Sequence, residues 1–208
     1  MNQTTKPRRT QAERSAATKA KILDAAQSLI AKRGLAHTST QDIAGEANVS
    51  RGAMLHHFPS RNALIRAAYA DMLQREVTLV RDFARTLPPG QDKLKELTDY
   101  IWERYQKGVF HVSMDYISEA RVDAEELSYV SEESQKFNDA LNDVWHIELA
   151  AFGCDPETRQ AMMNEFMCLV RGMAFQSQWR REPEYFHKML RDWLARAQSV
   201  LVPRFTAG

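Results

Sequence analysis

The sequence predicts an all-α protein, in which a three-helix unit near the amino-terminal end is followed by a larger unit of six helices. Three observations support this fold class. No segment sustains the apolar and polar alternation of a β-strand, apolar residues recur at helical spacing, and glycine and proline stand where helices would end. With 208 residues, of which 44% are hydrophobic, the chain is long enough to bury a substantial core.

The first predicted helix runs from about residue 18 to residue 32. Its apolar positions between Ile22 and Ile30 recur at helical spacing, and Gly34 supplies a stop after two basic residues. Residues 1–17 hold basic side chains among Thr, Gln and Ser, with too few apolar groups to pack. We therefore expect a flexible basic arm over 1–17, ahead of a compact unit over 18–61.

A short second helix is predicted to begin after Ser39. The Ser39 hydroxyl can cap this helix while Asp42, three residues on, reaches back to it. Ile43, Ala44 and Ala47 then share one face, which we expect to be buried.

A tight turn and a third short helix follow. Asn48 falls at the turn, where a left-handed backbone is expected, and Asn tolerates that conformation best after Gly. Ser50 can cap the next helix, whose Met54 and Phe58 face the core. Two short helices around such a turn are typical of the helix-turn-helix, in which the second helix enters the major groove of DNA.

Charge is distributed unevenly along the chain. Residues 1–61 hold ten Lys or Arg and four acids, a balance of +6, whereas the remaining 147 residues carry −5. A protein with a basic first third and an acidic remainder is suited to meet a polyanion at one end only. This pattern favours DNA binding by the first unit, and the basic arm could become ordered in a minor groove.

Over roughly residues 18–66 the sequence resembles the TetR family of bacterial transcriptional regulators. The positions that carry the resemblance are Ile43, Ala44, Ala47, Asn48, Val49, Ser50, Gly52, His57, Phe58 and Arg61. Two positions depart from the family pattern. Asn48 stands where the family usually has Gly, and Leu55 stands where it usually has a Tyr that hydrogen-bonds a DNA phosphate, a role that His56 could take over.

The resemblance implies which residues contact DNA. Arg51, which can pair bidentately with guanine, Gln41 and His56 are expected at base edges, and the small residues Gly52 and Ala53 allow a close approach. Expected phosphate contacts are Ser39, Thr40, Ser50, His57 and Arg61. Two alternatives stay open, because His57 could instead pack under Phe58 and Arg61 could be a solvated charge.

The remainder, residues 62–208, is expected to form a ligand-binding and dimerisation domain. After the third helix, six more are predicted, over about 61–86, 91–107, 109–121, 124–152, 156–181 and 183–203. The last two carry apolar residues on more than one face or at sustained helical spacing. Paired with a second copy they would close a four-helix bundle, although burial within one chain would give the same pattern.

The resemblance also implies a small-molecule site, which composition permits. Met and aromatic side chains adapt to apolar ligands, although each of them could simply be core. The candidate ligand-binding residues are Trp102, Tyr105, Phe110, Met114, Phe137, Leu141, Trp145, Met163, Phe166 and Met167.

Several classes of protein are disfavoured. The sequence has no Gly-rich phosphate loop, no His-Glu-X-X-His metal pattern and no nucleophile elbow, so we expect no enzyme, no metal and no cofactor. No apolar run is long enough to span a bilayer and no secretory signal is visible, so a cytoplasmic location is expected. Cys154 and Cys168 are expected to be reduced, with Cys168 in the core.

The sequence therefore predicts a homodimeric, sequence-specific DNA-binding regulator of transcription. Repression is the commoner mode in the family that it resembles, with release from a palindromic operator when a small, largely apolar ligand binds. The alternative is a helical interaction or ligand-binding module without specific DNA binding.

Overall fold

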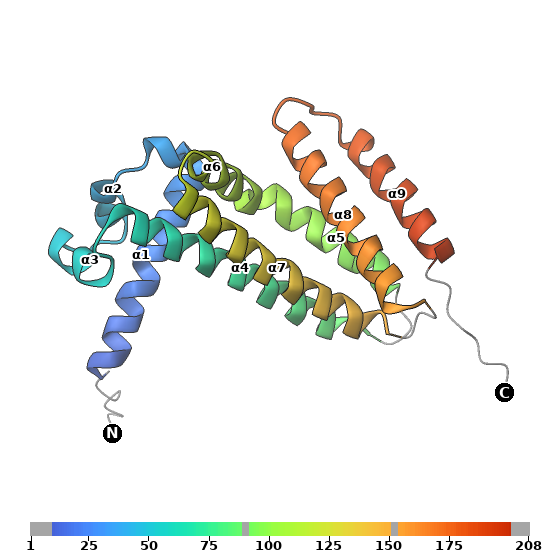
Figure 1. Cartoon of the computed structure of the whole chain (residues 1–208), viewed down its shortest axis with the longest axis horizontal. Coiled ribbons are helices and arrows are strands. Elements are labelled where there is room, and N and C mark those ends of the chain that lie inside the picture. The colour runs from blue at the N-terminus through green and yellow to red at the C-terminus, as the bar shows by residue number, and fades with distance from the viewer. Residues whose placement is uncertain (1–9, 89–91, 151–153, 201–208) are drawn as a thin grey trace, which may run out of the picture. The chain divides into compact units, whose positions relative to one another are not determined.

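The computed structural model describes residues 10–88, 92–150 and 154–200, and these residues form helices without a β-strand (Figure 1). The α-helices are α1 (Gln11–Arg33), α2 (Thr40–Glu46), α3 (Arg51–His57), α4 (Arg61–Thr86), α5 (Lys93–Arg104), α6 (Phe110–Ala120), α7 (Ala124–Glu148), α8 (Pro156–Gln176) and α9 (Pro183–Val200). A 3-10 helix, η1 (Leu35–His37), follows α1, and a π-helical turn, η2 (Tyr105–Val109), joins α5 to α6. The predicted all-α fold class is confirmed.

The chain divides into two compact units, residues 1–71 (unit 1) and 72–208 (unit 2). The division lies inside α4, further along the chain than the boundary predicted after residue 61. α4 buries Leu64 and Ala68 in its first half, and Val77 and Val80 in its second half. One uninterrupted helix therefore contributes to the core of both units.

The first helix begins earlier than predicted. α1 starts at Gln11, so residues 11–17 of the expected flexible arm are helical, and the rest of that arm, 1–9, lies outside the described residues. Thr10 and Glu13 explain the difference, because they form a reciprocal capping box. The Thr10 hydroxyl accepts from the Glu13 backbone N–H at 3.2 Å and the Glu13 carboxylate accepts from the Thr10 N–H at 2.7 Å.

The two short helices of unit 1 are capped as predicted. The Ser39 hydroxyl accepts from the Asp42 N–H at 3.1 Å, and the Asp42 carboxylate accepts from the Ser39 N–H at 3.0 Å. The Ser50 hydroxyl accepts from the Ala53 N–H at 3.1 Å at the start of α3. Between them Asn48 adopts φ 52°, the left-handed conformation expected of the turn.

A shared core fixes these helices against α1. Its members come from α1, α2, α3 and the first half of α4, and they include Ile22, Leu29, Ile43, Ala44, Ala47, Met54, Phe58 and Leu64. Met54 is 1% exposed and Phe58 is 4% exposed, so both predicted anchors of the third helix are buried. The rotation of α3 about its own axis is set by these two side chains.

In unit 2 the fifth and sixth predicted helices were expected to be separated at Gly108. The structure instead joins α5 to α6 through a kinked π-helical turn. Lys107 and Gly108 leave helical geometry inside η2, and Gly108 has φ 108°, which favours glycine. Other helix ends also differ from the sequence-based ranges, since α5 ends at Arg104, α7 at Glu148 and α8 at Gln176. The predicted ends at 152 and 203 lie outside the described residues.

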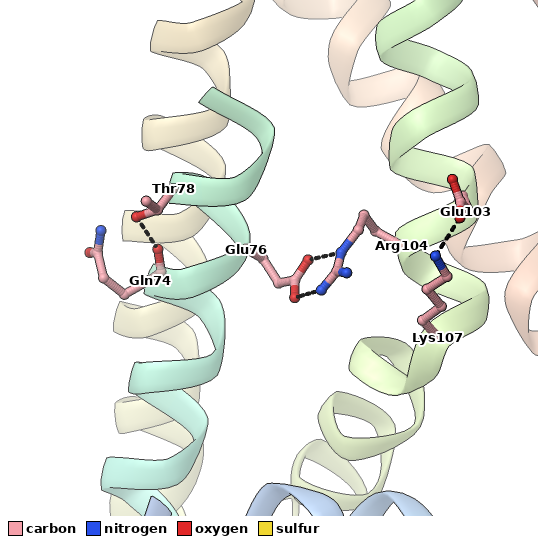
Figure 2. A network of polar contacts seen from close by, with 6 residues as sticks. All are labelled: Gln74, Glu76, Thr78, Glu103, Arg104 and Lys107. Atoms are coloured by element: carbon pink, nitrogen blue, oxygen red, sulfur yellow. Dashed lines mark hydrogen bonds and ion pairs between the residues drawn. The ribbon is translucent and has the colours of Figure 1, made fainter. Parts of the chain in front are cut away.

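The second half of α4 is tied to α5 by a charged pair (Figure 2). The Arg104 Nε donates to one Glu76 carboxylate oxygen at 2.8 Å and the Arg104 Nη2 donates to the other, so the contact is bidentate. Glu76 is buried, and the hydrogen bonds to it raise the pKa of Arg104. A buried carboxylate of this kind is stable only while its partner remains.

One prediction about the core was wrong. Cys168, expected to be buried, is exposed, and Cys154 is half-buried; both are free thiols. Cys168 lies on the face of α8 turned away from Met163, Phe166, Met167 and Val170, which are buried. The sequence pattern of α8, apolar on more than one face, does not by itself distinguish the buried face from the exposed one.

Replacing Asn48 by Ala should lower the free energy of unfolding by about 1 kcal/mol, because a Cβ-bearing residue without the Asn side chain is disfavoured at positive φ. Asn48→Gly is the matched control and should change stability by about 0.5 kcal/mol or less. Urea denaturation of both variants measures the difference. Equal stabilities of the two variants would contradict the role given to the turn.

Replacing Glu76 by Gln should lower the free energy of unfolding by about 1–3 kcal/mol, because the half-buried Arg104 guanidinium loses its charged partner. Glu103→Gln is the control, since Glu103 pairs with Lys107 at an exposed position and should cost less than about 1 kcal/mol. Denaturation monitored by circular dichroism gives both values, and an E76Q protein as stable as E103Q would refute the argument.

Candidate nucleic-acid interface

The outward side of α3 consists of four residues, which we call the α3 face: Arg51, Gly52, Leu55 and His56, all exposed. They are contiguous on a helix, because positions three and four apart lie side by side. Ala53 and His57, also predicted to contact DNA, are half-buried at the edges of this face. The structure therefore brings two predicted base-contacting residues, Arg51 and His56, onto one exposed surface with Gly52, which was predicted to allow a close approach.

The candidate residues of α2 lie at its amino-terminal end. Ser39 and Gln41 are exposed and Thr40 is half-buried. The Ser39 hydroxyl is already engaged, since it accepts from the Asp42 N–H and donates to the Asp42 carboxylate at 2.6 Å. These hydrogen bonds from Ser39 lower the pKa of Asp42 below its usual value. Gln41 is thus the exposed candidate of α2 whose side chain takes no part in the cap.

The two arginines proposed for DNA contact have different surroundings. The Arg61 Nη2 donates to the Leu35 carbonyl at 3.1 Å, so this side chain ties the first turn of α4 to η1. Arg51 has no hydrogen bond or ion pair with any of the described residues. The expectation that Arg61 could be a solvated charge is wrong, because it is half-buried and bonded within unit 1.

The two adjacent histidines are arranged edge to face. The rings of His56 and His57 are 5.5 Å apart at an interplanar angle of 67°, and the ring of His57 is 6.4 Å from that of Phe58. His57 therefore packs partly beside Phe58, as one of its two predicted alternatives had it. His56 remains exposed on the α3 face.

The described part of unit 1, residues 10–71, is positively charged. It holds eight Lys or Arg and five acids. One ion pair in it, between Arg33 and Asp42 at 4.0 Å, connects α1 to α2. A surplus of positive charge in this unit favours the binding of a polyanion.

Nine of the ten candidate ligand-binding residues are buried in unit 2, and the tenth, Met114, is 37% exposed. The Phe166 ring stacks on that of Trp145 at 6.2 Å, and it also lies 4.8 Å from the tilted ring of Trp193. Trp193 was not predicted for the site, because its spacing on α9 resembles that of the other core positions of that helix.

A half-open cavity of about 420 Å³ lies between α5 and α9 in unit 2. Trp102 is the one candidate ligand residue in its lining, which otherwise consists of Lys95, Thr98, Asp99, Glu103, Gln106, His187, Leu190, Arg191 and Leu194. The other nine candidates do not line this cavity. Their burial fits core packing, which was the alternative for each of them.

The two helices predicted to form a dimer interface differ in exposure. The apolar stripe of α9 is turned inward, with Phe186, Leu190, Trp193 and Ala197 buried. In contrast, Phe175 near the end of α8 and Trp179 in the turn that follows are 49% and 60% exposed, with rings 5.1 Å apart in an edge-to-face contact. Figure 1 shows α8 and α9 side by side.

None of the helices described has a stretch long and apolar enough to cross a membrane. Over 10–88, 92–150 and 154–200, no group of three or more His, Cys, Asp or Glu side chains is placed to hold a metal ion.

Comparison with known sequences supports the assignment of unit 1. The family model of the "bacterial regulatory proteins, tetR family" matches residues 22–68, which contain α2, the turn and α3. The helix-turn-helix (HTH) type transcriptional regulator CymR of Pseudomonas putida is 28% identical over 182 residues, covering 88% of this chain and 90% of the relative. The HTH-type regulator TtgR, also of Pseudomonas putida, is 43% identical over 55 residues, 26% of each chain.

Solved structures share the fold along nearly the whole chain. A TetR-family regulator from Agrobacterium tumefaciens superposes with a TM-score of 0.67 at 22% identity, covering 88% of this chain and 98% of that one. A TetR regulator from Legionella pneumophila gives 0.65 at 17% identity, covering 92% and 99%. The relatives are regulators of transcription and not enzymes. With its helix-turn-helix, its all-helical second unit and these matches, the chain is similar to the bacterial regulatory proteins of the tetR family, whose model matches unit 1 over residues 22–68.

Proposed function

We propose that this protein is a homodimeric regulator that binds a palindromic DNA operator through α3 and leaves it when a small, largely apolar ligand binds unit 2. The observation that carries the proposal is the composition of the α3 face, where an arginine without a partner among the described residues lies beside a glycine. Such a regulator acts where the chromosome is, in the cytoplasm, and repression is the mode that we propose.

Gly52 supports a close approach to another molecule. Glycine in a helix costs roughly 0.5–1 kcal/mol relative to alanine. Nothing within unit 1 requires it, because a Cβ built at Gly52 would have the Ser50 hydroxyl at 4.0 Å as its nearest neighbour. Since internal packing does not explain this glycine, we attribute it to contact with base edges, where a side chain would hold α3 away from the groove.

Arg51 supplies the chemistry of base readout. A guanidinium donates two parallel hydrogen bonds to O6 and N7 of guanine, and that pairing discriminates by about 1–3 kcal/mol. An arginine that makes no bond within the described protein needs no rearrangement to do so. Gln41 would reach a second base edge from α2, while Thr40 and His57 would contact the DNA backbone, which positions the helix.

Dimerisation would place two copies of α3 on one face of DNA. A twofold pair reads half-sites roughly 34–36 Å apart, which is one turn of the double helix. The exposed Phe175 and Trp179 favour α8 as the larger contributor to that interface, since large apolar side chains are rarely left in water in such pairs. The inward-facing stripe of α9 would contribute less.

Unpaired buried polar atoms support a ligand in unit 2. Within the described residues the indole N–H groups of Trp145 and Trp193 and the Asn142 side-chain oxygen are buried without a hydrogen-bond partner. A buried donor of this kind is costly unless it is paired. An apolar ligand with one hydrogen-bond acceptor would satisfy an indole N–H while its remaining surface contacts the stacked rings.

Ligand binding would be communicated through α4, the helix that contributes to both units. We propose that the ligand shifts α6 and tilts α4, so that the two copies of α3 no longer match the half-site spacing. DNA and ligand would then weaken each other's binding by the same factor.

Selection from random DNA duplexes at about 150 mM salt should enrich a palindrome, because nonspecific phosphate attraction is weakened there. Arg51→Ala should then weaken operator binding by roughly 5- to 150-fold and relax specificity at one base position. The control is Arg85→Ala in unit 2, where the side chain is exposed and should not affect binding. A folded dimer that enriches no sequence would favour the interaction-module alternative.

Replacing Gly52 by Ala should stabilise the protein by about 0.5–1 kcal/mol and weaken operator binding roughly tenfold, about the effect of one lost base contact. Gly45→Ala is the matched control, since Gly45 is also an exposed helical glycine with nothing within 4 Å of a built Cβ. It should raise stability equally and leave binding unchanged. Thermal unfolding and fluorescence anisotropy measure the two effects, and unaltered binding by G52A would contradict the close approach of α3.

A further inference from the structure

We propose that Leu55 reads the 5-methyl group of a thymine in the major groove. This inference rests on the proposed function, since it assumes that α3 lies in that groove. Leu55 is 44% exposed, and over residues 10–71 it is the one large hydrophobic side chain that is exposed. Every other large apolar residue in that range is buried or half-buried.

Leu55 lies within the α3 face and not at its margin. It follows Arg51 by four residues and Gly52 by three, so both are its direct neighbours on the helix surface. An arginine that pairs with guanine and a glycine that permits close approach therefore place Leu55 at base level. His56 lies beside it on the same face.

Leu55 cannot turn into the core to escape water. Met54, the preceding residue, is 1% exposed and Phe58 is 4% exposed, and together they fix the rotation of α3. The Ser50 cap and the Asn48 turn fix where the helix begins. The apolar side chain is therefore held outward by the same contacts that present Arg51.

The chemistry of the groove selects the partner. Phosphate oxygens and most base-edge atoms offer hydrogen-bond donors or acceptors, which an isobutyl group cannot use. The thymine C5-methyl is the apolar group that unmodified bases present in the major groove. Removing both groups from water on contact is favourable, whereas Leu55 facing any other base edge would desolvate a polar atom without a partner.

The test uses the full-length dimer and the operator obtained by selection. Each thymine of one half-site is replaced in turn by deoxyuridine, which deletes the methyl group alone. For the native protein we expect one position at which the replacement weakens binding about fourfold, the effect of one buried methyl-sized group. In Leu55→Ala the effect at that position should disappear, while the effects of base changes elsewhere persist.

Two controls separate the outcomes. Leu79→Ala truncates a similarly exposed leucine in unit 2 and should retain the deoxyuridine effect in full. The dependence of affinity on salt should be unchanged in L55A, because no phosphate contact is lost, whereas a contact of Leu55 with the DNA backbone would leave no position sensitive to uracil.

Three results would overturn the inference. These are an operator half-site without thymine, no uracil-sensitive position in the native complex, or a uracil effect of the same size in L55A. In each case the operator is still bound, so the proposed function stands and only the role of Leu55 fails. If no operator is obtained at all, the proposed function fails first and the inference fails with it.

Discussion

The α2 and α3 helices have seven residues each, which is too short to be stable alone in water. The presentation of the α3 face therefore depends on the contacts by which unit 1 stabilises these two helices. Few contacts stabilise these two helices. Capping hydroxyls from Ser39 and Ser50 satisfy helix-end N–H groups, Asn48 accepts the left-handed turn, and Met54 and Phe58 anchor α3 in the core. The Asn48 turn, the Ser50 cap and the two buried anchors also set the direction of α3, so stability and recognition rest on the same residues.

Local chemistry explains why unit 1 could be predicted well from sequence. A cap, a left-handed turn and an i, i+4 pair are encoded within a few residues, and all three were found where the sequence placed them. The start of α1 was missed although Thr10 and Glu13 carry the spacing of a capping box, because the apolar pattern used to begin the helix appears only further along. At Leu55 the sequence indicated an outward-facing residue that lacks the Tyr hydroxyl, and its exposure in the structure agrees with that position.

Unit 2 was less predictable, because its defining contacts join residues far apart in sequence. Glu76 and Arg104 have no local signal of their pairing, and neither do the neighbouring rings of Trp145, Phe166 and Trp193. Helical spacing identified the buried positions of α9 but could not tell which side of α8 is covered, hence the exposed Cys168. The helices could be predicted because helix formation is local, whereas a ligand site depends on how several of them pack.

The passage of α4 through both units restricts how this chain can change in length. Each added or deleted residue rotates everything downstream on a helix by about 100°. Between Ala68 and Val77 such a change would alter the rotation between the buried residues of the first half of α4, Leu64 and Ala68, and those of its second half, Val77, Val80 and Ala84. Insertions and deletions should therefore be confined to the connections between helices, and an exchange of the first unit between related proteins would succeed only with the helical phase of α4 preserved.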